Sequence, residues 1–276
     1  MLQLTTHAKA SLSAAAGAQI SAVVTTPPSP FIGVAVLLHG IATNKSERAN
    51  FFVELSERLA ANAIASVRFD FRGHGESANP PRDFTVASQV IDCLSVVSWI
   101  RDQLKTEAVH LIGFEFSAPA ALSAAILRPT WIKTVNLIGP VLDFRRTYMS
   151  PDTKFGARVF NPERLSLAFK NGFVPLNKRF NLDVKTIVEM ESLEPFRALP
   201  RVRQPVLILH GKEDTSVPFY LSEELAGHQE NVILKQISPM SSGFTAPGDE
   251  AGVGSDSREN LAQITAAISE QIRRSA

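Results

Sequence analysis

The chain has 276 residues, of which 45% are hydrophobic, enough for a large buried core in one or two domains. Its 28 basic and 27 acidic residues leave a net charge of +1, so overall charge indicates neither nucleic acid nor an anionic membrane as a partner. The single cysteine, Cys93, excludes an internal disulfide framework, and its apolar neighbours favour a core residue. No stretch reaches the roughly 18 apolar residues that span a bilayer, so we expect a cytoplasmic protein.

The first predicted element is an N-terminal hairpin, because residues 2–8 and 18–25 alternate apolar with small or polar side chains. Buried-strand runs and amphipathic helices then alternate along the chain. The expected strands are 33–38, 64–70, 108–113, 132–139, 205–210 and 231–237, and the expected helices are 47–62, 86–105, 117–128, 217–226 and 257–274. This order predicts an α/β fold with a mostly parallel, eight-stranded sheet and helices on both faces.

One stretch, residues 143–196, breaks this alternation because it has no buried-strand run and carries scattered prolines and aromatics. Its aromatic residues include Tyr148, Phe155, Phe160, Phe169, Phe173 and Phe180. An insert between two strands at the carboxyl edge of a sheet is where a lid belongs. We therefore expect a core formed by 1–142 and 197–276 and a lid or cap formed by 143–196. An irregular helical excursion that packs its own aromatics is also compatible with that position.

The residues at the carboxyl ends of the strands are the ones to examine, because ligands of open parallel sheets bind there. Four such segments are LLHGIATNKSE at 37–47, ASVRFDFRGHGES at 65–77, HLIGFEFSAPAAL at 110–122 and PVLILHGKEDTSVP at 205–218. In this order and spacing they resemble the α/β-hydrolase superfamily. They are most similar to small carboxylesterases of the feruloyl and cinnamoyl esterase type, related to the serine aminopeptidase and monoglyceride lipase group.

The resemblance assigns a catalytic role to three positions. The nucleophile elbow of the family, G-x-S-x-G, corresponds to Gly113 through Ser117, which places Glu115 where the family has its serine. Asp214 holds the acid position in the H-G-x-x-D-x-x-V-P pattern, and Ser242 stands where the histidine should follow the last strand. The family triad would thus be Glu115, Asp214 and Ser242. Because serine chemistry needs a base that takes and returns a proton, we expect no ordinary serine-esterase activity.

The histidines and the oxyanion hole give further expectations. Of the six histidines, His7 and His228 look peripheral, His110 and His210 lie in strand segments, and His39 and His74 border the expected mouth of the site. The resemblance implies an oxyanion hole formed by the backbone N–H groups of Ile41 and Phe116, with His39 beside it. In one interpretation these donors bind the Glu115 carboxylate itself, which would then plug the site.

Several functions remain open at this point. The first interpretation is a non-hydrolytic protein or pseudo-enzyme that binds a small organic ligand in a pocket under the lid. The alternatives are an enzyme that uses Glu115 as general acid or base in a lyase, isomerase or cyclase step, and a hydrolase that acts on esters, halides or epoxides through Glu115. The sequence has no metal-ligand spacing and no phosphate- or dinucleotide-binding motif, so no metal and no cofactor is expected. A homodimer or a partner protein remains open, including a partner that supplies a histidine.

Overall fold

The computed structural model describes residues 5–77, 80–149, 153–226 and 229–275. Their main feature is an eight-stranded sheet with the strand order β1-β2-β4-β3-β5-β6-β9-β10. The antiparallel pairs β1–β2 and β2–β4 lie at one edge, and the remaining neighbours are parallel. The strands are β1 Thr6–Ser13, β2 Gln19–Thr26, β3 Val34–Leu38, β4 Ala65–Phe69, β5 Val109–Phe114, β6 Thr134–Ile138, β9 Val206–Gly211 and β10 Val232–Ile237. The mostly parallel eight-stranded α/β sheet is therefore confirmed. An N-terminal hairpin is present as well, but its first strand runs Thr6–Ser13 and not 2–8 as predicted, and residues 2–4 of the predicted strand lie outside the described residues.

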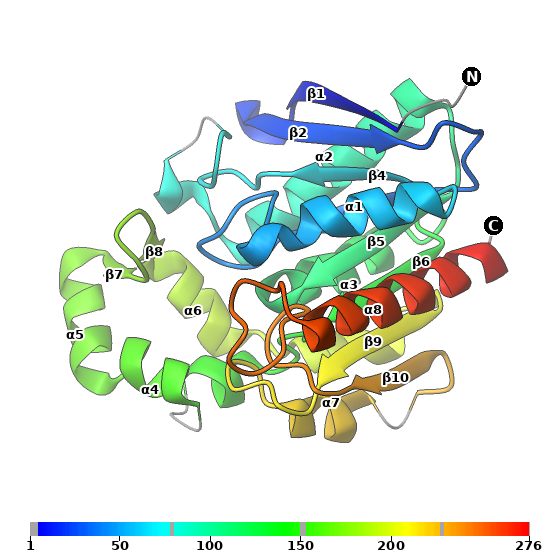
Figure 1. The fold of residues 1–276 in the computed structure, drawn as a ribbon. Coiled ribbons are helices and arrows are strands. Elements are labelled where there is room, and N and C mark those ends of the chain that lie inside the picture. Colours follow the sequence, from blue (N-terminus) through cyan, green and yellow to red (C-terminus); the bar gives the residue numbers. More distant parts are fainter. Residues whose placement is uncertain (1–4, 78–79, 150–152, 227–228, 276) are drawn as a thin grey trace.

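Helices cover both faces of this sheet (Figure 1). Helices α1 (Phe51–Ala61) and α8 (Ser255–Arg274) lie in front of it, and α2 (Val86–Leu104) and α3 (Ala118–Leu127) lie behind it, while α7 (Phe219–Ala226) packs near β9 and β10. Periodicity explains the burial of α8, whose apolar residues recur every three or four positions and are buried at Leu261, Ile264, Ile268 and Ile272. Burying side chains of this size contributes about 1.5–3 kcal/mol each.

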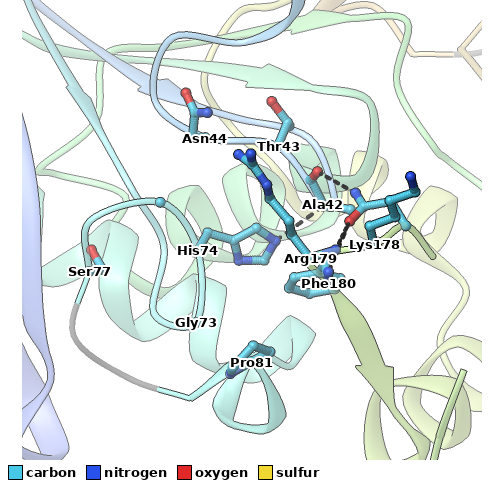
Figure 2. A pocket seen from close by; sticks show the side chains of 12 residues that line it. Ala42, Thr43, Asn44, Gly73, His74, Ser77, Pro81, Lys178, Arg179 and Phe180 are labelled. Atoms are coloured by element: carbon cyan, nitrogen blue, oxygen red, sulfur yellow. Dashed lines mark hydrogen bonds between the residues drawn. The ribbon is translucent and has the colours of Figure 1, made fainter. Parts of the chain in front are cut away.

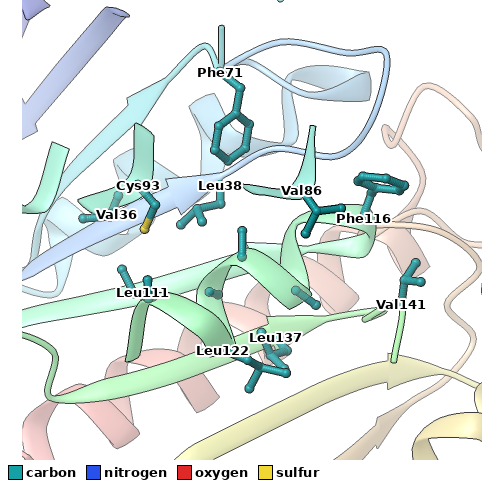
Figure 3. Close-up of a cluster of buried hydrophobic side chains, with 14 of the residues drawn as sticks. Val36, Leu38, Phe71, Val86, Cys93, Leu111, Phe116, Leu122, Leu137 and Val141 are labelled. Atoms are coloured by element: carbon teal, nitrogen blue, oxygen red, sulfur yellow. The ribbon is translucent and has the colours of Figure 1, made fainter. Parts of the chain in front are cut away.

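Two apolar cores result, one on each side of the sheet. The core behind the sheet is the larger one and joins strand residues such as Val36 and Leu111 to helix residues such as Leu122 (Figure 3). Cys93 belongs to this core, where burial raises the pKa of its thiol, so it is a packing residue as predicted. The other core packs α1 and α8 against β3, β5 and β9.

The insert 143–196 forms elements of its own beyond the carboxyl ends of the sheet strands (Figure 1). These are the short π-helix η5 (Arg145–Met149), the helices α4 (Lys154–Val159), α5 (Pro162–Asn171) and α6 (Val184–Ser192), and a small antiparallel pair of β7 (Phe173–Pro175) and β8 (Asn181–Asp183). The turn η6 (Pro195–Arg201) then returns the chain to β9. In the described part of the chain, no helix combines the length and the apolarity that crossing a membrane requires.

Candidate active site

Glu115 lies at the sharp turn between β5 and α3, which is the elbow predicted from the sequence. Its backbone φ is +45°, a left-handed conformation that is uncommon outside glycine, and the turn η4 (Glu115–Ser117) leads directly into α3. Ser117 fixes this turn, because its buried hydroxyl donates to the carbonyl of Leu38 on β3 at 2.7 Å and accepts the N–H of Phe114 at 2.9 Å. Gly113 allows the close packing, since a β-carbon there would lie 3.1–3.4 Å from atoms of β6 and α3.

Ser242 meets Glu115 from the loop that follows β10. Its Oγ donates a hydrogen bond of 2.6 Å to Oε1 of Glu115, although 127 positions separate the two residues in the chain. Glu115 is only 8% exposed, whereas Ser242 is partly exposed. The structure therefore brings two of the three sequence-predicted triad positions into direct contact.

Asp214, the third position, follows β9 and is also buried. Its Oδ1 accepts the N–H groups of Ser216 at 2.7 Å and Val217 at 2.9 Å, while its Oδ2 lies 3.6 Å from Nε2 of His210. That histidine is already bonded elsewhere, with Nδ1 2.7 Å from the Ser222 hydroxyl and Nε2 3.1 Å from the carbonyl of Val217. Asp214 thus acts on Glu115 through its negative charge, which raises the pKa of the Glu115 carboxyl.

Burial and charge raise the pKa of the Glu115 carboxyl. The largest cause is burial, which penalises the ionised form, and the negative charge of Asp214 adds to it. Exposed Arg48, the Ser242 hydroxyl and His210 act in the opposite direction. The sequence left the sign of this shift open, and the structure gives it as upward. A carboxyl of this kind is a stronger base than an exposed glutamate.

Glu47 is a second buried carboxyl at this site, and no motif in the sequence singles it out. Its Oε1 accepts the N–H of Gly40 at 2.5 Å, and a β-carbon on Gly40 would lie 3.4 Å from both this oxygen and Oε2 of Glu115. Burial and then the charge of Glu115 raise the pKa of Glu47 to about 8. The group is therefore predominantly protonated at neutral pH.

The backbone around Glu47 explains why sequence patterns did not reveal it. The expected helix 47–62 begins only at Phe51, and Glu47 adopts φ 59° and ψ 175°, a region that non-glycine residues rarely occupy. Ala49 and Asn50 are left-handed as well. Lys45 anchors the loop, because its N–H and its ammonium group both bond to buried Asp70. Acidic residues are common just before helices, so Glu47 does not stand out in the sequence. It enters the site because of the unusual backbone conformation at this position.

The predicted oxyanion residues lie beside the elbow. Ile41 and Phe116 are buried, and within the part of the chain that the structure describes neither of their N–H groups donates to the Glu115 carboxylate. His39 holds the loop, since its Nδ1 donates to the carbonyl of Gly40 at 2.7 Å and its Nε2 accepts the N–H of Phe71 at 3.0 Å. Burial lowers the pKa of His39 to about 4, so the ring is neutral. Both of its nitrogens are used for backbone bonds.

Two further aromatic rings belong to this region. His74 accepts the N–H of Ala42 at 3.1 Å and packs against Phe180 of the insert, with ring centroids 4.3 Å apart. Tyr148, which the sequence showed only as one of the insert aromatics, is buried, and both burial and the charge of Glu115 raise the pKa of its hydroxyl.

His228 and the side chain of Phe155 lie outside the described residues.

Two cavities flank the loop 39–47. One, of about 350 Å³, adjoins the Glu115–Ser242 contact, and its lining includes Glu47, Arg48, Phe51, Phe114, Ser242 and Phe244. The other, of about 630 Å³, lies where the insert turn 177–180 meets the loops 42–44 and 73–77 (Figure 2). There Asn177 donates to the carbonyl of Ala42 at 3.1 Å, which joins the insert to the core. Among the described residues, no group of three or more histidine, cysteine or acidic side chains is arranged to hold a metal ion.

Comparison with known proteins assigns the family. The model of the alpha/beta hydrolase family matches residues 35–237, and the chain belongs to this family. The solved structure of Est1E from Butyrivibrio proteoclasticus with bound ferulic acid is similar, with a TM-score of 0.75 and 20% identity over 94% of this chain and 97% of that one. The fold predicted from the ordered motifs is confirmed, as is the similarity to feruloyl-esterase-type carboxylesterases.

Two curated relatives are similar at the sequence level. Serine hydrolase BPHL of Mus musculus is 26% identical over 197 residues, which are 66% of this chain and 64% of the relative. Lysophosphatidylserine lipase ABHD12 of Danio rerio is 23% identical over 192 residues, which are 70% of this chain and 46% of the relative. The matched region spans about half to two thirds of the length of these relatives.

Proposed function

We propose that the chain is a hydrolase of small carboxylic esters in which Glu115 is the general base. The observation that carries this proposal is the 2.6 Å hydrogen bond from the Ser242 hydroxyl to Glu115 beside an open cavity. The raised pKa of Glu115 supports it, because a base works best when its pKa approaches the working pH. In this proposal Glu115 accepts and returns protons, and it is not the nucleophile.

The relatives favour this function over the first interpretation made from the sequence. The two curated relatives are named as a serine hydrolase and a lipase, which supports hydrolysis over a non-hydrolytic role. Absence of the ordinary serine mechanism remains part of the proposal, because Glu115 occupies the elbow.

The proposed ligand is a small organic ester with an aromatic part. Phe51, Phe114 and Phe244 line the smaller cavity, and Phe51 packs with the other two at centroid distances of 5.7 and 5.1 Å. The relative Est1E binds ferulic acid, an aromatic carboxylic acid. We also propose that 143–196 acts as a cap on the core 1–142 and 197–276, since its turn 177–180 borders the larger cavity.

Ligand binding without turnover is the second candidate. It is favoured by the bonding of His210, which lies 3.6 Å from Oδ2 of Asp214, because both of its ring nitrogens are bonded away from Glu115. In this case a bound ligand would raise the melting temperature, and no product would form.

The test is hydrolysis of 4-nitrophenyl acetate and methyl ferulate by the wild type and by Glu115→Gln. General acid–base catalysis contributes about 10²- to 10⁴-fold, so kcat/KM of the variant should fall at least about 100-fold. Glu107→Gln is the matched control, because Glu107 is exposed and pairs with Arg101 away from the site. Equal rates for the wild type and Glu115→Gln would overturn the proposal. Stabilisation by ferulic acid without any turnover would establish the second candidate instead.

A further inference from the structure

We propose that Ser242 is the nucleophile of this hydrolase and that Glu115 at the elbow activates it. The nucleophile would then lie on the loop after β10, and the base would occupy the position that carries the nucleophile in the family. This inference rests on the proposed function and adds to it the residue that becomes acylated.

The direction of the contact between the two side chains supports these roles. Ser242 has the hydroxyl proton and Glu115 Oε1 accepts it at 2.6 Å, which is the arrangement of a nucleophile with its base. Ser242 lines the 350 Å³ cavity, while Glu115 lies behind it and is 8% exposed. Of the two, Ser242 is therefore the side chain that an ester in this cavity meets.

The loop that carries Ser242 is fixed by its own hydrogen bonds. The N–H of Ser241 donates to the carbonyl of Thr245 at 2.8 Å, and both the N–H and the hydroxyl of Thr245 donate to the carbonyl of Ser242, at 3.2 and 2.9 Å. Phe244 anchors the turn in the core, and Asn260 of α8 donates to its carbonyl at 3.1 Å. A nucleophile held in this way needs little reorganisation before attack.

The charged groups around the pair suit a carboxylate base. Asp214 and burial favour the protonated form of Glu115 after proton transfer, and exposed Arg48 keeps the ionised form accessible before it. Glu47 lines the same cavity and retains its proton at neutral pH, because its pKa is about 8. Both of its carboxyl oxygens accept backbone N–H groups, from Gly40 and Arg48, and the neutral group adds no negative charge to the cavity in which the oxyanion develops.

The reaction balances without a cofactor. The Ser242 oxygen attacks the carbonyl carbon while its proton moves to Glu115, which gives a tetrahedral oxyanion. The bond to the alcohol oxygen then breaks, Glu115 returns the proton to this leaving group, and an acyl ester remains on Ser242. Water attacks this ester, passes one proton to Glu115, and the acid leaves as Ser242 regains that proton.

The experiment is covalent labelling of the wild-type protein with a fluorophosphonate, followed by peptide mass spectrometry. We expect one phosphonyl adduct, on Ser242. Ser95→Ala is the matched control, because the Ser95 hydroxyl donates to the carbonyl of Ile91 within α2, away from the cavity, and its loss leaves the Ser242–Glu115 contact in place. This variant should label like the wild type, whereas Ser242→Ala should not label, and Glu115→Gln should label at least 100-fold more slowly.

The outcomes separate this inference from the proposed function. Ester turnover that needs Glu115 but leaves Ser242 unlabelled and persists in Ser242→Ala would overturn the inference, because water would then be the direct nucleophile. Turnover that is unaffected by Glu115→Gln would overturn the proposed function itself. Mapping the adduct on the wild type keeps the result independent of how well any variant folds.

Discussion

The buried carboxyl of Glu47 should give this protein a stability that falls as pH rises. The group has a pKa of about 8 in the folded protein against an ordinary value of 4.5, so the folded state binds its proton more tightly than the unfolded state. The contribution of this bound proton to the free energy of unfolding is fully present below pH 4.5 and is lost as pH rises through 8. Each pH unit within this window costs the fold about 1.4 kcal/mol.

Glu47→Gln removes this titration, because the amide cannot ionise, while its oxygen can still accept the N–H of Gly40. The free energy of unfolding of the variant relative to the wild type should therefore increase by about 3–4 kcal/mol between pH 5 and pH 8. Urea unfolding followed by tryptophan fluorescence at several pH values measures this difference. Parallel curves for the two proteins would refute the reasoning.

The coupling to Glu115 supplies a second check on the same measurement. Because the charge of Glu115 is the second cause that raises the pKa of Glu47, Glu115→Gln should move the upper end of the pH-dependent range to lower pH. An unchanged range would mean that the two carboxyls do not interact.

Three further changes test the site and its support. Ser117→Ala leaves a buried carbonyl and a buried N–H without their hydroxyl partner, and should lower the free energy of unfolding by about 1–3 kcal/mol in urea. Asp92→Ala leaves buried Arg72 without its ion pair, and should lower the free energy of unfolding by about 3–5 kcal/mol in the same measurement. For either variant, a loss below about 1 kcal/mol would contradict the burial of the groups that lose their partner. The double variant Glu115→Ser, Ser242→His rebuilds the family triad with Asp214, and should gain hydrolysis of 4-nitrophenyl esters that both single variants lack.

The sequence predicted the fold well because its signals are local and repeated. Apolar runs ending at His39, Asp70, Gly113 and His210 marked the parallel strands, and the order of those ends identified the elbow at Glu115. Contact between Ser242 and Glu115 then followed from the topology, because the loops after β5 and β10 both lie at the carboxyl edge of the sheet.

Two properties of the site were beyond the sequence because they depend on backbone conformation and burial. The position of Glu47 depends on an unusual φ and ψ in a loop that looked like the start of a helix. The sign of the Glu115 pKa shift depends on how burial and Asp214 compare with Arg48 and the Ser242 hydroxyl, and only three-dimensional placement fixes that balance.

The pH dependence of kcat/KM for an aryl ester, measured for the wild type and Glu115→Gln, tests the central claim most directly. If Glu115 is the general base, the wild-type rate rises with pH as this carboxyl ionises, with a midpoint above 4.5, and the variant loses both the rate and this step. A wild-type profile without that step, or a variant that retains it, would contradict the assignment of Glu115 as the base.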